Sequence, residues 1–244
     1  MRLFKNLAET RRLAKPPTRE SWAFQRYRFL SIFLSVPLVR VGISANQITI
    51  AWILLDILGA VALGFQNYGV RLFGVCLLQL SELLDFVDGE VARLSEQTSK
   101  CGAFLDNVGH DVWRRGLFLA IGYQVFRATH SVAYLLLAFS SAVFVGSYQM
   151  APLLAEYVGL RETTGNTGSS IRSRVTSVAL ARKIVAPVFL LMRNVKMVIC
   201  IAVIFDRLPW VLWCYAITSP VLFLWRIFRL SYRLRRDFGS VRTC

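Results

Sequence analysis

The sequence predicts an all-α, polytopic membrane protein with six transmembrane helices and an N-terminal interfacial amphipathic helix. Its 244 residues are 55% hydrophobic with a mean hydropathy of +0.50, whereas soluble domains are roughly 45–50% apolar. The apolar residues are gathered into six runs that are each long enough to cross the hydrocarbon core as a helix. The basic residues alternate between the segments that connect these runs. These three observations favour one membrane domain over a soluble fold.

The six apolar runs define the predicted spans. Within lipid, each backbone amide needs a partner inside its own segment, so the runs are expected to be helices. They cover residues 47–66, 70–92, 102–126, 131–154, 183–205 and 209–230. We therefore divide the chain into a basic N-terminal segment (1–46), a six-helix transmembrane domain (47–230) and a basic cytoplasmic tail (231–244).

The N-terminal segment contains the predicted interfacial helix. Between residues 21 and 42, bulky apolar side chains alternate with Arg26, Arg28 and Arg40, a pattern typical of a helix lying in the membrane surface. A seventh span is the competing interpretation, and Pro37 together with the flanking arginines argues against it.

The net charge of +15 is explained by topology. Basic residues crowd the two ends of the chain and the segments after the second and fourth runs, whereas Arg71, Arg127 and Arg207 are isolated in the other three connections. This is the positive-inside pattern for six helices with both termini in the cytoplasm. We therefore expect the cationic side chains to contact anionic membrane lipid, and we expect no nucleic-acid partner.

The acidic residues are unevenly placed. Half of the 14 Asp and Glu lie between Glu82 and Asp111, across the end of the second predicted span and the start of the third. Charge is costly at this depth, so such residues usually face a partner or a wet cavity. One interpretation is a solvated cluster in which these acids pair with Arg93, Arg114 and Arg115.

The spacing of three of these acids favours a metal site instead. Asp85 and Asp88 are three residues apart and share one helix face. On the next predicted helix, Asp106 and His110 are spaced by one turn, so both helices can direct oxygen atoms to one point. Three carboxylates at close range repel unless cations lie between them, and oxygen ligands suit Mg²⁺ or Mn²⁺. Two such ions side by side are the usual apparatus for phosphoryl displacement.

These residues belong to a longer motif. The segment reads Asp85-x2-Asp88-Gly89-x2-Ala92-Arg93-x8-Gly102-x3-Asp106-x3-His110. It resembles the signature of the CDP-alcohol phosphatidyltransferase family, D-x2-D-G-x2-A-R-x8-G-x3-D-x3-D, at every fixed position except the last. The resemblance extends over roughly residues 40–230, because the family core also has six transmembrane helices and an interfacial N-terminal helix.

The resemblance implies an enzyme of phospholipid biosynthesis. Such an enzyme transfers a phospho-alcohol group, usually phosphatidyl, from a CDP-alcohol such as CDP-diacylglycerol to an acceptor alcohol and releases CMP. It also implies a two-ion Mg²⁺ or Mn²⁺ site held by Asp85, Asp88, Asp106 and His110, an active site at the cytoplasmic side, and a homodimer, since dimers are common among relatives.

The family resemblance also implies a nucleotide site. Gly89, Ala92, Arg93 and Gly102 belong to the motif together with Asp88, and the small residues allow a ligand to approach closely. Before the first span, the sequence around Asn46 and Thr49 is similar to the family's Pro-Asn-x2-Thr segment, without the proline. In the family, the Asn and Thr lie near the cytidine. A simple polar helix start is the alternative for these two residues.

His110 departs from the motif, because the family has a fourth Asp at this position that acts as general base and helps to hold a metal. Three interpretations follow. Neutral His110 is the catalytic base; or neighbouring Asp111 takes over after a local helix adjustment; or turnover has been lost. Asp106 is counted with these two residues as a catalytic candidate.

Further basic residues are candidates for binding a phosphate on the acceptor or the donor. Arg193 and Lys196 lie inside the fifth predicted span, where a charged side chain is costly and usually has a functional role or a partner. Arg114 lies one turn after His110. Snorkelling, or pairing with Asp56 or Asp111, is the alternative for the first two.

Two further functional classes remain as rivals, besides a basic DNA- or RNA-associated membrane protein, whose sign would be salt-sensitive binding of nucleic acid. One is a relative that binds nucleotide or lipid without turnover. The other is a transporter, which would place charged or broken helices in paired halves of the sequence, a symmetry that this chain lacks.

Overall fold

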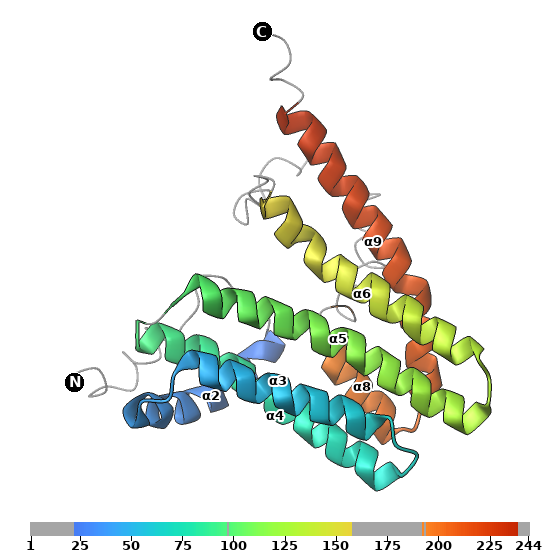
Figure 1. Ribbon diagram of the computed structural model, residues 1–244, viewed down its shortest axis with the longest axis horizontal. Helices are drawn as coiled ribbons and strands as arrows, with labels where there is room; N and C mark the ends of the chain where they lie inside the picture. Colours follow the sequence, from blue (N-terminus) through green and yellow to red (C-terminus); the bar gives the residue numbers. More distant parts are fainter. Residues whose placement is uncertain (1–21, 97, 158–191, 193, 239–244) are drawn as a thin grey trace. The chain divides into compact units, whose positions relative to one another are not determined.

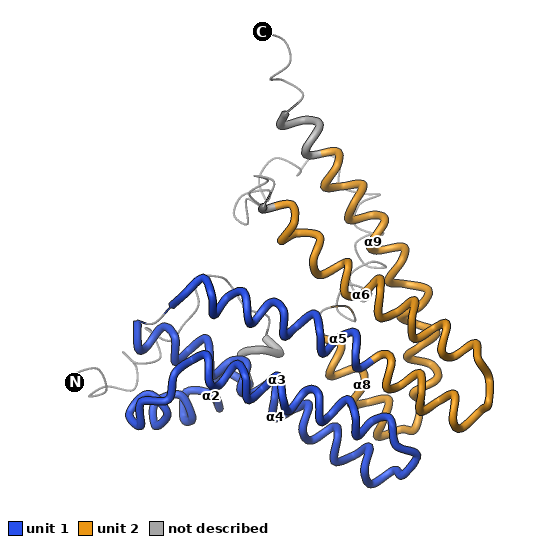
Figure 2. Tube along the Cα trace, in the orientation of Figure 1, with its two compact units in different colours: residues 1–117 blue, residues 118–244 orange. Residues whose placement is uncertain are grey.

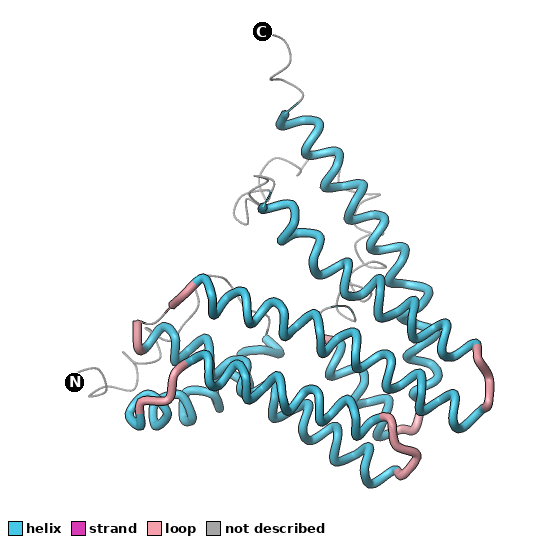
Figure 3. The backbone as a smooth tube through the Cα atoms, viewed as in Figure 1, coloured by secondary structure: helices cyan, strands magenta, loops and turns pink. Residues whose placement is uncertain are grey.

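Helices account for all the regular structure that is described. The computed structural model describes residues 22–96, 98–157, 192 and 194–238, and within them it has helices and no strand (Figures 1 and 3). The helices are α2 (Trp22–Val41), α3 (Ala45–Leu63), α4 (Tyr68–Leu94), α5 (Lys100–Thr129), α6 (Ala133–Tyr157), α8 (Val195–Ile204) and α9 (Leu208–Phe238). The all-α prediction is confirmed for this part of the chain.

The chain divides into two compact units, residues 1–117 and 118–244 (Figure 2). The first contains α2, α3, α4 and the first part of α5, and it carries the acidic motif. The second contains the rest of α5 together with α6, α8 and α9.

Three helices are long and apolar enough to cross a membrane, by length and composition: Ala45–Leu63, Ala133–Ala155 and Leu208–Tyr232. They match three of the six predicted spans. Helices α4 and α5 cover two further predicted spans, and both carry members of the acidic motif. Helix α8 covers the latter part of the run 183–205, of which residues 183–191 and 193 lie outside the described residues, as does the greater part of the connection before the run.

The outer faces of these helices are apolar. Leu54 and Leu58 on α3, Leu136 and Phe139 on α6, and Phe228 on α9 are all more than half exposed. A soluble monomer rarely exposes contiguous apolar surface on this scale. Lipid is a solvent in which these side chains carry no penalty, so the surface supports an integral membrane protein.

Glycines allow α3 and α4 to pack closely in the first unit. A Cβ atom added at Gly74 would lie 2.9 Å from the Cβ of Ala62 and 2.9 Å from the carbonyl oxygen of Gly59. Near this crossing, the Ser81 hydroxyl of α4 donates to the fully buried Asp56 carboxylate of α3. The mid-span Asp56 is therefore paired inside the helix contact.

The start of α3 is fixed by a capping box. The Ser44 hydroxyl accepts from the Gln47 amide at 3.4 Å, and the Gln47 side chain accepts from the Ser44 amide at 2.9 Å. The preceding Gly42 has a φ of +83°, a conformation that favours glycine. This cap places Asn46 and Thr49 in the first turns of the helix.

Helix α2 occupies the predicted interfacial segment and packs against α4. The Glu90 carboxylate of α4 is fully buried and accepts from the hydroxyls of Ser31 and Ser35, both at 2.6 Å, and from Arg28 at 3.1 Å. Each Glu90 oxygen is thus hydrogen-bonded, as a buried charge requires. The polar face of α2 is directed at the protein, and exposed Phe29 and Phe33 lie on its outer side.

In the second unit, α6 packs against α9 and α8 against α9. The Arg226 guanidinium of α9 lies 4.3 Å from the centre of the Tyr148 ring of α6 and donates to the Tyr148 carbonyl at 3.0 Å. Helix α9 continues to Phe238, so the first residues of the predicted tail, 231–238, are helical.

Substitution of Gly74 by Ala should destabilise the first unit, because the added methyl group has no room against Ala62 and the Gly59 backbone. We expect a loss of about 1–3 kcal/mol, measured as a lower unfolding temperature of the purified protein in detergent. Gly116→Ala is the matched control, since a Cβ there meets nothing within 4 Å. Equal unfolding temperatures for the two variants would contradict the close packing of α3 on α4.

Candidate functional site

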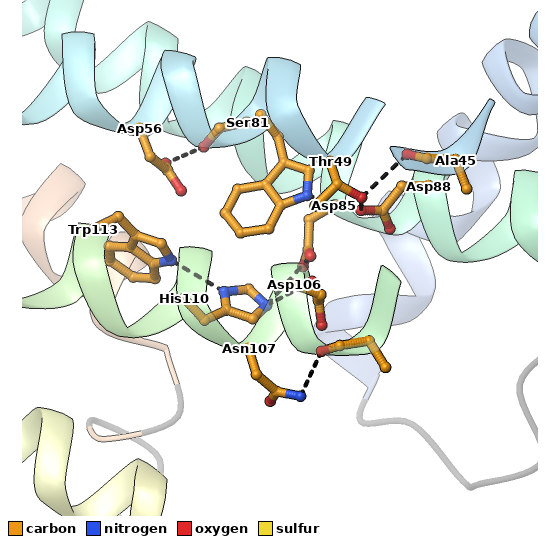
Figure 4. Close-up of polar contacts among 12 residues, drawn as sticks. Ala45, Thr49, Asp56, Ser81, Asp85, Asp88, Asp106, Asn107, His110 and Trp113 are labelled. Atoms are coloured by element: carbon orange, nitrogen blue, oxygen red, sulfur yellow. Dashed lines mark hydrogen bonds and ion pairs between the residues drawn. The ribbon is translucent and has the colours of Figure 1, made fainter. Parts of the chain in front are cut away.

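Three helices of the first unit supply the site (Figure 4). Helix α3 contributes Thr49 and Trp52, α4 contributes Asp85 and Asp88, and α5 contributes Asp106 and His110. The motif residues, separated along the sequence by the turn between α4 and α5, therefore meet in space.

Asp85, Asp106 and His110 form a compact group of potential metal ligands. Their ligand atoms all lie within 4.8 Å of one another. The His110 Nε2 atom lies 3.3 Å from Asp85 Oδ1 and 3.6 Å from Asp106 Oδ1, and Figure 4 shows the three side chains directed toward each other. All three are partly exposed, so an ion from solution has access to them. Two carboxylates at this range suit a hard divalent cation such as Mg²⁺ or Mn²⁺.

Asp88 is held beside this group by two donors from α3. The Thr49 hydroxyl and the Trp52 indole N–H both donate to Asp88 Oδ2 at 2.8 Å. Trp52 is fully buried and Asp88 is nearly so. Because both bonds fall on one oxygen, Oδ1 retains its capacity to act as a ligand.

A cavity of about 200 Å³ opens beside the carboxylates. It is lined by Ala45, Asn46, Thr49, Asp88, Gly89, Ala92, Thr98, Ser99, Gly102, Ala103 and Asp106. This lining includes every residue predicted to bind the nucleotide except Arg93, whose guanidinium lies beside Gly89. A Cβ at Gly102 would lie 2.9 Å from the Asn46 Oδ1 atom, so the absence of a side chain there keeps the cavity open.

Two other predicted residues of the first unit, Asp111 and Arg114, belong neither to the ligand group nor to the cavity lining. Asp111 accepts two hydrogen bonds from Arg115 one turn later, at 2.8 and 2.9 Å. Arg114 lies with its guanidinium 5.1 Å from the centre of the Trp113 ring. Lys196 is buried in α8 of the second unit, and Arg193 lies outside the described residues.

Sequence reasoning missed two tryptophans of this site. Trp52 donates to Asp88, as described above, and its ring lies 4.9 Å from the His110 ring, centre to centre. Trp113 donates from Nε1 to His110 Nδ1 at 3.0 Å. The available signal was spacing, because each lies three residues after a motif partner, Thr49 or His110, and so shares its helix face.

Comparisons with known proteins find relatives for the part of the chain that carries this site. The family model of the CDP-alcohol phosphatidyltransferases matches residues 42–208. Curated relatives include two proteins named bifunctional IPC transferase and DIPP synthase. That of Thermococcus kodakarensis is 38% identical over 79 residues, 32% of this chain and 17% of the relative; that of Aquifex aeolicus is 41% identical over 63 residues, 26% of this chain and 14% of the relative. The matches thus span less than a fifth of either relative.

Solved structures share the fold. Crystal structures of Mycobacterium tuberculosis phosphatidylinositol phosphate synthase, one with CDP-DAG bound and one with manganese and citrate, superpose with TM-scores of 0.59 and 0.58 at 19% identity. Both cover 81% of this chain, and the match covers 91% and 87% of the respective synthase chains.

Divalent-cation binding should differ between variants of two aspartates on α5, Asp106 and Asp111. Asp106→Asn removes a carboxylate from the ligand group and should weaken Mn²⁺ binding by at least about 10- to 100-fold, measured from the electron paramagnetic resonance signal of free Mn²⁺. Asp111→Asn should leave binding unchanged, because Asp111 is paired with Arg115. If both variants lose the ion equally, the ligand group has been misassigned.

Proposed function

Because the chain belongs to the CDP-alcohol phosphatidyltransferase family, we propose that it transfers a phosphatidyl group from CDP-diacylglycerol to an acceptor alcohol and releases CMP. The product is a phospholipid or its precursor, which places the reaction in phospholipid biosynthesis. The choice of this donor among CDP-alcohols is supported by the CDP-DAG bound to a synthase of the same fold.

One observation carries the proposal: the aspartates of α4 and α5 converge beside a cavity lined by the small residues of the motif. Asp88 and Asp106 each belong to the cavity lining, and Asp106 also belongs to the ligand group. A diphosphate placed there would have carboxylate-bound cations on one side and a pocket for its nucleoside on the other. Asn46 and Thr49 at the start of α3 complete that pocket.

The donor set fits a divalent cation. Asp85, Asp88 and Asp106 would hold Mg²⁺ or Mn²⁺ through oxygen, and the family signature implies two ions with the residue at position 110 as a further ligand. A bound ion would supply neutralisation of the diphosphate charge and of the departing CMP. The residues of α3 keep the Asp88 carboxylate in place for this role.

The transfer is a displacement at phosphorus. The acceptor hydroxyl oxygen forms a bond to the phosphorus that bears the diacylglycerol, the bond from that phosphorus to the oxygen of CMP breaks, and the hydroxyl proton passes to a base. Among the three candidates, Asp106 lines the cavity, whereas Asp111 is engaged by Arg115. Asp106 is therefore better supported as the proton acceptor than Asp111.

The acceptor is an alcohol that the cationic residues would help to select. Arg114, which lies on α5 after His110, is our first candidate for a phosphate-binding residue, and Arg193 and Lys196 are further candidates. An acceptor that carries its own phosphate would suit such residues.

In the membrane, we propose that six spans cross the bilayer, with α4 and α5 as the second and third, and that α2 lies in the interface. Both termini and the carboxylate group then face the cytoplasm, and two copies of the chain form a homodimer. The basic connections support this orientation.

A relative that binds nucleotide or lipid without turnover is the second candidate function. The observation that favours it is the histidine at position 110, where the family has its fourth Asp. Such a protein would keep the cavity and the ligand group and release no CMP.

The test is to incubate purified protein with CDP-diacylglycerol, Mg²⁺ or Mn²⁺ and a panel of alcohols, with and without a phosphate, and to measure CMP. We expect release that depends on both the metal and one class of alcohol. Asp88→Asn should reduce it to background, because the carboxylate that joins the cavity to the ligand group is lost, whereas Asp111→Asn should retain it. Nucleotide binding without CMP release under every condition would favour the non-catalytic alternative.

The orientation of α5 can be measured by labelling with a membrane-impermeant thiol reagent. In a variant whose only cysteine is Cys101, an exposed residue at the start of α5, we expect labelling in inverted membrane vesicles. With Ser131→Cys as the only cysteine, just after α5, we expect labelling in right-side-out vesicles. Labelling of both from the same side would show that α5 does not cross the membrane.

A further inference from the structure

The His110 ring is held by contacts at both of its nitrogens. Trp113 donates its indole N–H to Nδ1 at 3.0 Å, and Nε2 faces Asp85 Oδ1 at 3.3 Å and Asp106 Oδ1 at 3.6 Å. The rings of Trp52 and Trp113 lie against the imidazole, with centres 4.9 and 6.4 Å away. Figure 4 shows the chain of contacts from Trp113 through His110 to the two aspartates.

This arrangement selects one form of the imidazole. A neutral histidine has one N–H donor and one acceptor nitrogen, and an indole N–H can only donate. Nδ1 is therefore the acceptor, and the ring hydrogen is on Nε2. That hydrogen points to the aspartates, which are acceptors when ionised.

A histidine that ligates a metal shows the opposite pattern. Its other ring nitrogen almost always donates to a carboxylate, a carbonyl or water, which leaves the ligating nitrogen with a lone pair. Here the other nitrogen accepts, so Nε2 presents a hydrogen. The same arrangement leaves no lone pair for the proton of the acceptor hydroxyl, because the lone pair of Nδ1 is occupied by the Trp113 N–H and Nε2 carries the ring hydrogen.

We propose that Trp113 is a positioning residue that fixes His110 as an N–H donor to Asp85, with Asp106 beside it, so that the centre binds one divalent cation instead of two. The proposal rests on the proposed function and makes its metal site more specific. His110 places an N–H bond where the fourth family Asp would add a ligand, and this bond offsets part of the repulsion between Asp85 and Asp106. The remaining oxygens, with those of Asp88, hold the single ion.

The form of the ring can be observed without any reaction. His130 is the only other histidine of the chain and lies in the connection between α5 and α6, so His130→Gln leaves His110 as the sole signal in protein labelled with ¹⁵N-histidine. We expect ¹⁵N nuclear magnetic resonance of the metal-free protein to show a hydrogen-bearing Nε2 and a bare Nδ1. Trp113→Phe, which keeps an aromatic ring and removes the N–H that Nδ1 accepts, should shift the ¹⁵N resonance of Nδ1. Trp210→Phe, an exposed position on α9, should change nothing.

A hydrogen on Nδ1 in the parent protein would overturn the proposal, and so would a spectrum that Trp113→Phe leaves unaltered. The parent spectrum needs no variant of the site, so its result does not depend on the stability of the Trp113 variant.

The stoichiometry of Mn²⁺ provides the second measurement. Equilibrium dialysis with saturating Mn²⁺ should give one ion per chain in the parent and two in His110→Asp, which restores the family ligand. Two ions in the parent, with CMP release intact, would overturn this inference and leave the proposed function standing. No bound ion and no CMP release, with the expected ring form observed, would overturn both the one-ion centre and the proposed function.

Discussion

The repulsion between carboxylates gathered on α4 and α5 is the constraint on which the first unit depends. Asp85, Asp88 and Asp106 are costly neighbours unless each finds donors or a cation. The chain supplies donors from both sides: Thr49 and Trp52 of α3 bind Asp88, and His110 faces Asp85 and Asp106. These donors hold the acids in place, and because both bonds to Asp88 fall on Oδ2, its Oδ1 retains the capacity to bind a divalent cation.

The same helices explain why the site lies beside a cavity. The capped start of α3 brings Asn46 and Thr49 to the motif, and Gly102 leaves space against Asn46. Glu90 lies two residues after Asp88 on α4, and its bonds to Ser31 and Ser35 attach α2 to this helix. The close approach of α3 and α4 at Gly59 and Gly74 supports the far end of the pair. The helix contacts that stabilise the first unit and the partly exposed group of carboxylates thus lie on the same helices.

Much of the fold and of the candidate site could be predicted, because the spacing of apolar and acidic residues can be read from the sequence. The helix content, the three helices that are long and apolar enough to cross a membrane, and the meeting of Asp85 with Asp106 follow from apolar runs and from side chains one turn apart. The bonds of Trp113 and Glu90 could not be predicted, because a tryptophan or a glutamate in a helix has many candidate partners and only the packing selects one. For the same reason the sequence left His110 and Asp111 as alternatives, because the pair that Asp111 forms with Arg115 depends on the packing. Arg193 lies outside the described residues, and its role stays a prediction.

The central claim is that oxygen atoms from α4 and α5 trap a divalent cation beside the cavity. The most direct measurement is anomalous scattering at the manganese absorption edge from crystals of the protein grown with Mn²⁺. The account predicts a peak within coordination distance of carboxylate oxygens of Asp85, Asp88 and Asp106. Well-ordered aspartates with no peak among them, or a peak held by other residues, would contradict it.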